Sequence, residues 1–354
     1  MKEVDKNSKK QSDPRSPDAT VQDSLVLPKA DSLGLANAES VEIRGSTVTN
    51  YSSIGTSQIY QWLPHGLEAS EIVFLPDVCP SRGPLPTGCS VRTTSPDWRR
   101  LALSDVGCGM QLLESTRSFD DFRESDWDAL GRSLLKYKGG LGDLGGGNHF
   151  LDAIVSYKTG RLFFLVHTGS RLESGLLDDF VDQPATFDRE YKRITGWARD
   201  NRDTIADVIR KHFGLCNLVL DLPHNTFEIE DDGAVTIRKG AVKTDPGVLS
   251  ILPSSMTGDV ALVRASEQVA SSLHSVSHGT GRTMSRGDAR NRISPTETAE
   301  IRNQVYIPEY IVDASLRTES TRCYRALDDC LDLLGPLVNV EERFGVIAYL
   351  GHLG

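Results

Sequence analysis

Residues 162–171, Leu-Phe-Phe-Leu-Val-His-Thr-Gly-Ser-Arg, decide the fold, because an apolar run of strand length ends there in a histidine, His167. A second run of this kind, Leu-Val-Leu-Asp-Leu at residues 218–222, is followed two residues later by His224. Short apolar runs of this length are typical of buried strands. Between them, apolar residues recur at helical spacing, with Thr186 as the expected cap. These residues are Phe187, Tyr191, Ile194, Ala198, Ile205, Val208 and Ile209.

The rest of the chain mixes short strands with helices. Strands and helices do not alternate regularly, so the pattern favours a single mixed α/β domain over a doubly wound parallel sheet. Tyr324, Leu327, Leu331 and Leu334 predict another amphipathic helix near the C-terminal end. Residues 1–38 are rich in Ser, Asp, Lys and Asn and have almost no apolar periodicity. We therefore expect a disordered tail over 1–38 and a folded domain over 39–354.

Composition narrows the class of protein. The 354 residues carry a net charge of −10, so binding to nucleic acid would require a local basic surface. No apolar run is long enough to cross a bilayer, and no N-terminal signal sequence is recognisable. The six cysteines lack CxxC spacing, which argues against a zinc ribbon and is typical of reduced thiols. We expect a cytoplasmic protein.

Five residues form a candidate metal site. Asp105 and Cys108 are three apart among glycines, and a carboxylate with a thiolate suits a borderline divalent metal such as Mn, Zn or Co. Taken alone, this motif is more often a tight turn whose cysteine is merely buried. His149 follows a glycine run, and His167 and His224 end predicted strands. A lone histidine in such a place is usually structural, but three of them beside Asp-x-x-Cys favour a two-metal site, a common device for phosphoryl transfer.

His278 is the candidate nucleophile. It lies among small residues in Ser275-Val-Ser-His-Gly-Thr-Gly-Arg282, and an imidazole can attack phosphorus to form a phosphoramidate. Arg282, Arg286 and Arg290 are spaced i, i+4 and i+8, so a helix here would place them on one face as a phosphate track. The alternative is an ordinary solvated charged face. Further basic and hydroxyl groups lie upstream, in Arg238-Lys-Gly and Pro253-Ser-Ser-Met256.

Seven motifs occur in one order along the chain. They are Asp105-Val-Gly-Cys108-Gly-Met, Gly-Gly-Asn148-His149-Phe, His167-Thr-Gly-Ser-Arg171, Ala198-Arg-Asp-Asn201-Arg202, His224-Asn225, Arg238-Lys-Gly-Ala and Ser-His278-Gly-Thr-Gly-Arg282. Together they make the chain similar to the RtcB family of RNA-splicing ligases, and the resemblance runs from about Val41 to the C-terminal end. It implies a central β-sandwich flanked by helices.

The resemblance also implies a reaction. The family uses GTP and manganese to join RNA bearing a 3′-phosphate or 2′,3′-cyclic phosphate to RNA bearing a 5′-hydroxyl, in tRNA splicing or RNA repair. By motif, two manganese ions would be held by Asp105, Cys108, His149, His167 and His224, with Cys108 bridging. His278 would carry the guanylyl group. Nucleotide contacts would come from Asn148, Asp152, Asn225, Pro253, Ser254, Ser255, Met256, Gly279, Thr280 and Gly281. RNA phosphates would contact Arg171, Arg238 and Arg282.

The chain departs from the family pattern in several places. Cys79 stands where the family usually has His, and Asp152 replaces a Glu that contacts guanine. Val260 falls near a family serine, and no lysine follows Lys243, although the family usually ends with a penultimate lysine. These changes cluster on guanine recognition, so we expect a retained metal and guanylylation core with altered nucleotide preference. The alternatives are a binuclear metal-dependent cyclic phosphodiesterase and a non-catalytic RNA-binding scaffold. An activating protein and any oligomeric state are left open.

Overall fold

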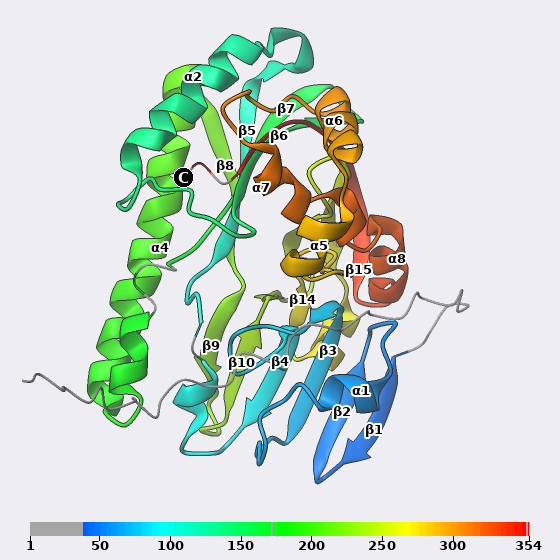
Figure 1. Ribbon diagram of the computed structural model, residues 1–354. Coiled ribbons are helices and arrows are strands. Elements are labelled where there is room, and N and C mark those ends of the chain that lie inside the picture. The colour runs from blue at the N-terminus through cyan, green and yellow to red at the C-terminus, as the bar shows by residue number, and fades with distance from the viewer. Residues whose placement is uncertain (1–37, 103, 171–172, 174, 352, 354) are drawn as a thin grey trace, which may run out of the picture.

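Two large β-sheets form the centre of the computed structural model, which describes residues 38–102, 104–170, 173, 175–351 and 353 (Figure 1). The seven-stranded sheet has the order β12 (Leu249–Pro253), β13 (Asp259–Ala265), β15 (Val338–Gly351), β6 (Phe150–Ser156), β7 (Arg161–Thr168), β5 (Gly109–Ser118) and β8 (Cys216–Pro223). The six-stranded sheet has the order β1 (Glu39–Ile43), β2 (Ser46–Asn50), β3 (Glu71–Cys79), β4 (Thr87–Thr93), β10 (Val235–Lys239) and β9 (Asn225–Ile229). A small sheet pairs β11 (Ala241–Lys243) with β14 (Ser275–Ser277).

The strand pairing explains why regular strand–helix alternation is missing from the sequence. Neighbouring strands pair antiparallel throughout the described ladders except β2 with β3, which are parallel. Antiparallel neighbours need no helical crossover between them. The expectation of a single mixed α/β domain is therefore confirmed.

A shared apolar core joins the two sheets, as a β-sandwich requires. One buried cluster contains residues of β3 from the six-stranded sheet and of β12 and β13 from the seven-stranded sheet. Its members include Val73, Leu75, Leu252, Ala261 and Val263. The apolar residues that alternate along these strands thus face each other across the sandwich.

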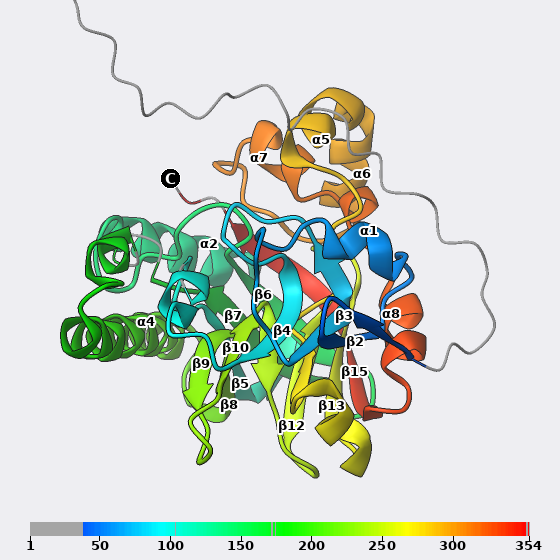
Figure 2. The ribbon, with the colours of Figure 1, turned by 90° about the horizontal axis from the view of Figure 1, so that it is seen from below.

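Helices flank the sheets on two sides. The long α4 (Pro184–Phe213) and α2 (Glu124–Leu134) lie side by side on one flank in both ribbon views (Figures 1 and 2). The opposite flank carries α5 (Arg286–Arg292), α6 (Pro295–Gln304) and α7 (Asp313–Thr318), while α8 (Leu327–Leu334) packs beside β3 and β13. The short α1 spans Thr56–Tyr60. Short 3₁₀ helices are η1 (Trp98–Leu101), η2 (Phe119–Asp121), η3 (Leu135–Tyr137), η4 (Gly175–Phe180), η5 (Glu267–Ser272) and η6 (Thr321–Cys323).

The strands and helices predicted from hydrophobic spacing are present, but some begin at other residues than predicted. Both predicted strands exist, as β7 and β8, and the helix between them is α4. The predicted cap Thr186 was wrong: α4 starts at Pro184, whose fixed φ suits a first helical position, so Thr186 lies within the first turn. Tyr324 precedes α8 and is not part of it.

Two other expectations concern the ends of the fold and the membrane. The predicted tail, residues 1–38, lies outside the described residues except for Ala38, and β1 begins at Glu39. Among the described helices, none combines the length and the apolar character needed to cross a membrane. No disulfide bond joins any of the six cysteines, all of which lie among the described residues, in agreement with the prediction of reduced thiols.

Phe164 tests how far stability depends on the core behind the histidine-bearing strand β7. Its ring is fully buried, 4.8 Å between centroids from Phe213 of α4 and 6.2 Å from Trp127 of α2. Phe164→Ala should lower the free energy of unfolding by about 3–5 kcal/mol, because it leaves a cavity. Phe119, which is 53% exposed, is the matched control. Phe119→Ala should change the free energy of unfolding by less than about 1 kcal/mol. Urea denaturation measures both, and equal effects would contradict this description of the core.

Candidate metal centre

The sheet topology brings the five predicted metal-binding residues to one edge. The strand order β6-β7-β5-β8 is antiparallel, so the starts of β5 and β6 lie beside the ends of β7 and β8. Cys108 immediately precedes β5, His149 precedes β6, His167 is the next-to-last residue of β7, and His224 follows β8. The register pairs Phe150 with His167, so these strand ends are level with one another.

The donor atoms form two groups that share one thiol. Asp105, Cys108 and His149 make the first group, and Cys108, His167 and His224 make the second. The Cys108 Sγ atom lies 3.5 Å from His149 Nε2 and 3.3 Å from His167 Nε2. His149 Nε2 is 3.2 Å from Asp105 Oδ2, and the Nε2 atoms of His167 and His224 are 3.3 Å apart.

The chemistry of these atoms fits divalent metal ions. A carboxylate, a thiol and three imidazole nitrogens converge, with neighbouring donor atoms 3.2–3.5 Å apart. Several of these atoms could coordinate one cation, and the mixed O, N and S set suits a borderline metal. The sharing of Cys108 makes it the natural bridge if both groups are filled.

Burial keeps His167 and His224 in the form that binds metal. His149, His167 and His224 are each only 2% exposed. Burial lowers the pKa of His167 well below its usual 6.5, and the neighbouring His149 and His278 act in the same direction. Burial likewise lowers the pKa of His224, with His278 and His167 adding to the effect. Both imidazoles are therefore neutral near pH 7 and have a lone pair to donate.

Glycines allow the donors to approach this closely. A Cβ on Gly169 would lie 2.5 Å from Asp105 Oδ1 and 2.8 Å from the Cβ of Cys108. Gly145 has a φ of +80°, and a Cβ there would lie 2.7 Å from His149 Nδ1. The amide of Ser170 donates to Asp105 Oδ1 at 3.1 Å and fixes the carboxylate. The predicted RNA contact Arg171 lies outside the described residues.

His278 lies beside the second donor group. Its ring centroid is 4.5 Å from that of His224 and 6.1 Å from that of His167. Its Nδ1 lies 2.6 Å from Oδ2 of Asp77, which is fully buried at the end of β3. A carboxylate only accepts, so Nδ1–H is the donor, and in the neutral form of this ring the lone pair is on Nε2. The sequence drew attention only to Cys79, two residues further along the same strand, and gave no sign of this contact.

The predicted nucleotide-binding segments meet near His278. The carbonyl oxygen of Pro253 would lie 3.1 Å from a Cβ on Gly279, so the loop after β12 adjoins the Gly279–Gly281 turn. Ser254 and Ser255 bond to Asp259 and Thr321, whereas the Met256 side chain is buried in the core. The Thr280 hydroxyl is buried without a hydrogen-bond partner. Asn148 lies in the turn that leads to His149.

Asp152 differs from these polar residues in its surroundings. Its side chain lies within β6, is 3% exposed, and has one carboxyl oxygen with no hydrogen-bond partner. Burial raises its pKa well above the usual range for a carboxyl group. The neighbouring β15 residue Tyr349 is also buried, and burial with nearby Glu319 and Asp152 raises its pKa.

Two of the predicted phosphate-binding arginines are engaged with protein groups. Arg282 pairs with the buried Glu319 at 3.1 Å and donates to the Thr318 carbonyl at 2.7 Å. Arg238 is almost fully buried and donates to Ser275 Oγ at 3.0 Å. The expected helical phosphate track was wrong, because α5 begins only at Arg286 and Arg282 precedes it.

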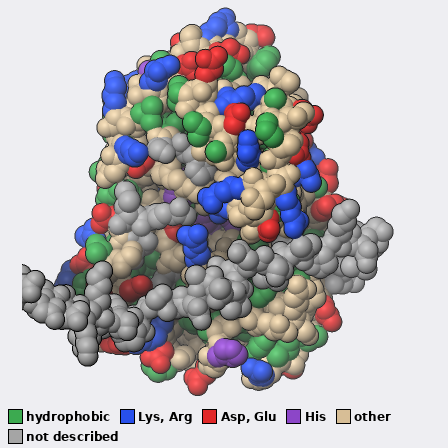
Figure 3. Space-filling view, in the orientation of Figure 1, with side chains coloured by type: hydrophobic (Ala, Val, Ile, Leu, Met, Phe, Trp, Pro, Cys, Tyr) green, Lys and Arg blue, Asp and Glu red, His purple; other side chains and the backbone are tan. Residues whose placement is uncertain are grey.

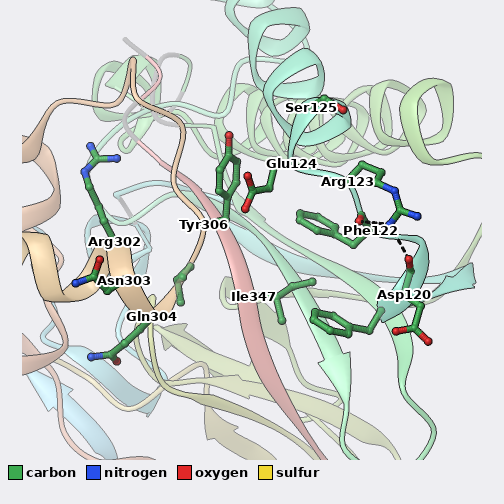
Figure 4. A pocket seen from close by; sticks show the side chains of 12 residues that line it. Asp120, Phe122, Arg123, Glu124, Ser125, Arg302, Asn303, Gln304, Tyr306 and Ile347 are labelled. Atoms are coloured by element: carbon green, nitrogen blue, oxygen red, sulfur yellow. Dashed lines mark hydrogen bonds between the residues drawn. The ribbon is translucent and has the colours of Figure 1, made fainter.

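Two features of the surface are histidine atoms on one face and a pocket formed by described residues. Figure 3 shows histidine atoms near the middle of one face, beside Lys and Arg side chains. The pocket, about 820 Å³, is formed by the start of α2, the end of α6 and Ile347 of β15 (Figure 4). Its lining includes the aromatic side chains of Phe122 and Tyr306 and the acidic side chains of Asp120 and Glu124. None of the predicted site residues lines it.

Comparisons with known proteins agree with the motif pattern. A family model described as tRNA-splicing ligase RtcB matches residues 189–344. RNA-splicing ligase RtcB2 of an Escherichia coli strain is 25% identical over 326 residues, covering 77% of this chain and 85% of that protein. RNA-splicing ligase RtcB of E. coli K12 is 27% identical, covering 56% and 58%. The tRNA-splicing ligase RtcB of Nanoarchaeum equitans is 25% identical, covering 64% and 60%.

The buried neutral histidines predict how the metal-free protein responds to pH. The folded pKa values of His167 and His224 lie below 6.5, so the unfolded chain binds more protons as the pH falls through 6.5. The contribution of these two histidines to the free energy of unfolding should therefore be fully present above pH 6.5. Below that pH the free energy of unfolding should decrease by up to about 1.4 kcal/mol per pH unit for each histidine. Urea denaturation in EDTA between pH 7.5 and 5 measures this. The double variant His167→Gln/His224→Gln should show a flatter dependence, and an unchanged slope would contradict the prediction.

Proposed function

Because the chain belongs to the RtcB family, we propose that it is an RNA ligase that joins RNA ends through a nucleotidylated histidine. The substrates are RNA with a 3′-phosphate or 2′,3′-cyclic phosphate and RNA with a 5′-hydroxyl, and the co-substrate is GTP. The observation that carries the proposal is the position of His278, oriented by Asp77 and adjacent to donor groups that share Cys108. A cytoplasmic location and a role in tRNA splicing or repair accompany it.

The five donors would hold two manganese ions, with Cys108 common to both. Bound there, the ions would supply Lewis acidity that neutralises charge on phosphoryl oxygens. The protein's own part is to bring the carboxylate, the thiol and the imidazoles together, with His167 and His224 buried and neutral near pH 7. The donor set and the lowered histidine pKa values support this assignment.

His278 would form the covalent intermediate. The lone pair on Nε2 attacks the α-phosphorus of GTP, and the bond to pyrophosphate breaks as the nitrogen–phosphorus bond forms. The Nδ1–H donates to Asp77, which stabilises the positive charge on the substituted ring. The guanylyl group then passes to the RNA 3′-phosphate, and the 5′-hydroxyl attacks that phosphorus and displaces GMP. Activation is needed because a 3′-phosphate alone has no good leaving group.

Nucleotide preference would differ from a strict requirement for GTP. Asp152 has a raised pKa in its buried position, so it would present a neutral carboxyl group in place of a negative charge. A neutral group distinguishes guanine less strongly than an ionised one, because hydrogen bonds to charged groups contribute about 1.5–3 kcal/mol. Val260 is also buried and apolar.

A metal-dependent cyclic phosphodiesterase is the second candidate. The two donor groups are complete without His278, so they would suffice to open a cyclic phosphate. The two functions differ in whether a covalent nucleotide on His278 is required.

Label transfer tests the ligase proposal. The protein is incubated with manganese and α-labelled GTP, denatured, and examined for acid-labile label. His278→Ala should abolish labelling, while the exposed His65→Ala, a matched control, should leave it unchanged. Asp77→Asn should reduce the labelling rate about a hundredfold or more, because Nδ1 is no longer held as the donor. Unlabelled wild-type protein that still opens cyclic phosphate would favour the phosphodiesterase.

Nucleotide competition tests the altered preference. With α-labelled ATP and GTP at equal concentration, the wild-type protein should accept both, within about tenfold of each other. Initial labelling rates measure the ratio. Exclusive use of GTP would contradict the role assigned to Asp152.

A further inference from the structure

The turn that carries Asp105 has an unusual backbone. Ser104 has a φ of +92° and Asp105 a φ of +49°, so two consecutive residues with side chains occupy left-handed conformations. Such conformations are unfavourable for residues other than glycine and persist only where surrounding contacts impose them. Without this turn, Asp105 and Cys108 would not both face His149. The contacts that hold the turn therefore decide whether the first donor group exists.

Two residues of the neighbouring β9–β10 hairpin hold this turn. The Lys239 ammonium donates to the Ser104 carbonyl at 3.1 Å and lies 3.3 Å from the Ser104 hydroxyl. The Asn225 side-chain amide donates to the Asp105 carbonyl at 2.9 Å. Asn225 and Lys239 are directly opposite each other in the β9–β10 register, so both side chains can reach the turn from the same end of the hairpin.

The hairpin is in turn fixed to the second donor group. The Asn225 side-chain oxygen accepts from the Gly240 amide at 2.8 Å, and its carbonyl accepts from the Gly107 amide at 3.0 Å. The His224 amide donates to the Cys108 carbonyl at 2.8 Å. The turn and the hairpin thus form one hydrogen-bonded unit behind the donor atoms.

We propose that Asn225 and Lys239 are positioning residues that hold the Ser104-Asp105 turn in its left-handed form and so aim the Asp105 carboxylate at Cys108 and His149. The sequence suggested nucleotide contacts for Asn225 and a phosphate-binding role for the basic segment. The side-chain contacts described here go to the backbone of the metal-binding turn. The inference rests on the metal site of the proposed function and is independent of the RNA chemistry.

Metal titration without nucleotide or RNA tests the inference. Mn²⁺ binding is measured by calorimetry, and Co²⁺ binding by its absorption. Lys239→Met should weaken binding to the Asp105 group about 10–100-fold, as expected for loss of a supporting contact. The thiolate-to-Co²⁺ charge-transfer band should persist, because Cys108, His167 and His224 remain. Lys243→Met, in the same region but paired with Glu228, is the matched control and should bind as the wild type does.

Ser104→Gly distinguishes positioning from a direct ligand contact. Glycine adopts a positive φ without strain, so Ser104→Gly in the Lys239→Met background should restore most of the lost affinity. Asn225→Asp removes the amide donor, keeps the acceptor for Gly240, and should respond to Ser104→Gly in the same way. The Asn225→Asp variant therefore provides an independent test if Lys239→Met does not fold.

Absence of rescue, or unchanged metal affinity in both Lys239→Met and Asn225→Asp, would overturn the inference. A wild-type protein that binds no Co²⁺ would also overturn it, together with the metal site. A protein that binds metal and shows rescue but never ligates RNA would refute only the proposed function.

Discussion

The geometry of the site depends on five side chains of metal-binding types that converge at one end of an antiparallel sheet. Asp105, Cys108, His149, His167 and His224 lie where four neighbouring strands begin or end, and the strand pairing fixes their separations. The donor atoms lie 3.2–3.5 Å apart, close enough for several of them to coordinate one cation. Burial lowers the pKa values of His167 and His224, and the glycines around the site and the left-handed turn at Ser104 allow the donors to approach this closely.

A second constraint orients the nucleophile relative to this edge. Asp77 comes from β3 of the six-stranded sheet, whereas the donors come from the seven-stranded sheet, so the sandwich itself brings His278 against His224. The site is thus assembled from both sheets, and the shared apolar core sets the distance between its halves. The Asn225–Lys239 hairpin also links the two sheets. It belongs to the six-stranded sheet and holds the Ser104-Asp105 turn that precedes β5 of the seven-stranded sheet.

Much of this arrangement could be predicted from the sequence, because local patterns carry it. The apolar runs before His167 and His224 predicted β7 and β8, and helical spacing predicted α4. The motif order indicated the similarity to RtcB ligases and predicted the donor set that the fold brings together. Long-range contacts could not be predicted in this way. The bond from Asp77 to His278 joins residues 201 positions apart, and no spacing rule describes it.

Other errors have local physical causes. The shared face of Arg282, Arg286 and Arg290 depended on the stretch being helical, but Ser285 caps α5 by accepting from the Asp288 amide, so the helix starts after Arg282. The same arginine is neutralised by the buried Glu319, a charge whose burial cannot be read from the sequence. The left-handed turn at Ser104 and Asp105 was also unforeseen, because neither residue is a glycine and positive φ angles are predicted mainly at glycines.

The most direct test of the central claim is a crystal structure of the manganese-soaked protein, with ions located by anomalous scattering. The account predicts two peaks about 3.5–4 Å apart, one on each side of the Cys108 sulfur, with Asp105 and His149 on one ion and His167 and His224 on the other. A single ion, or ions bound elsewhere with the five donors uncoordinated, would contradict it.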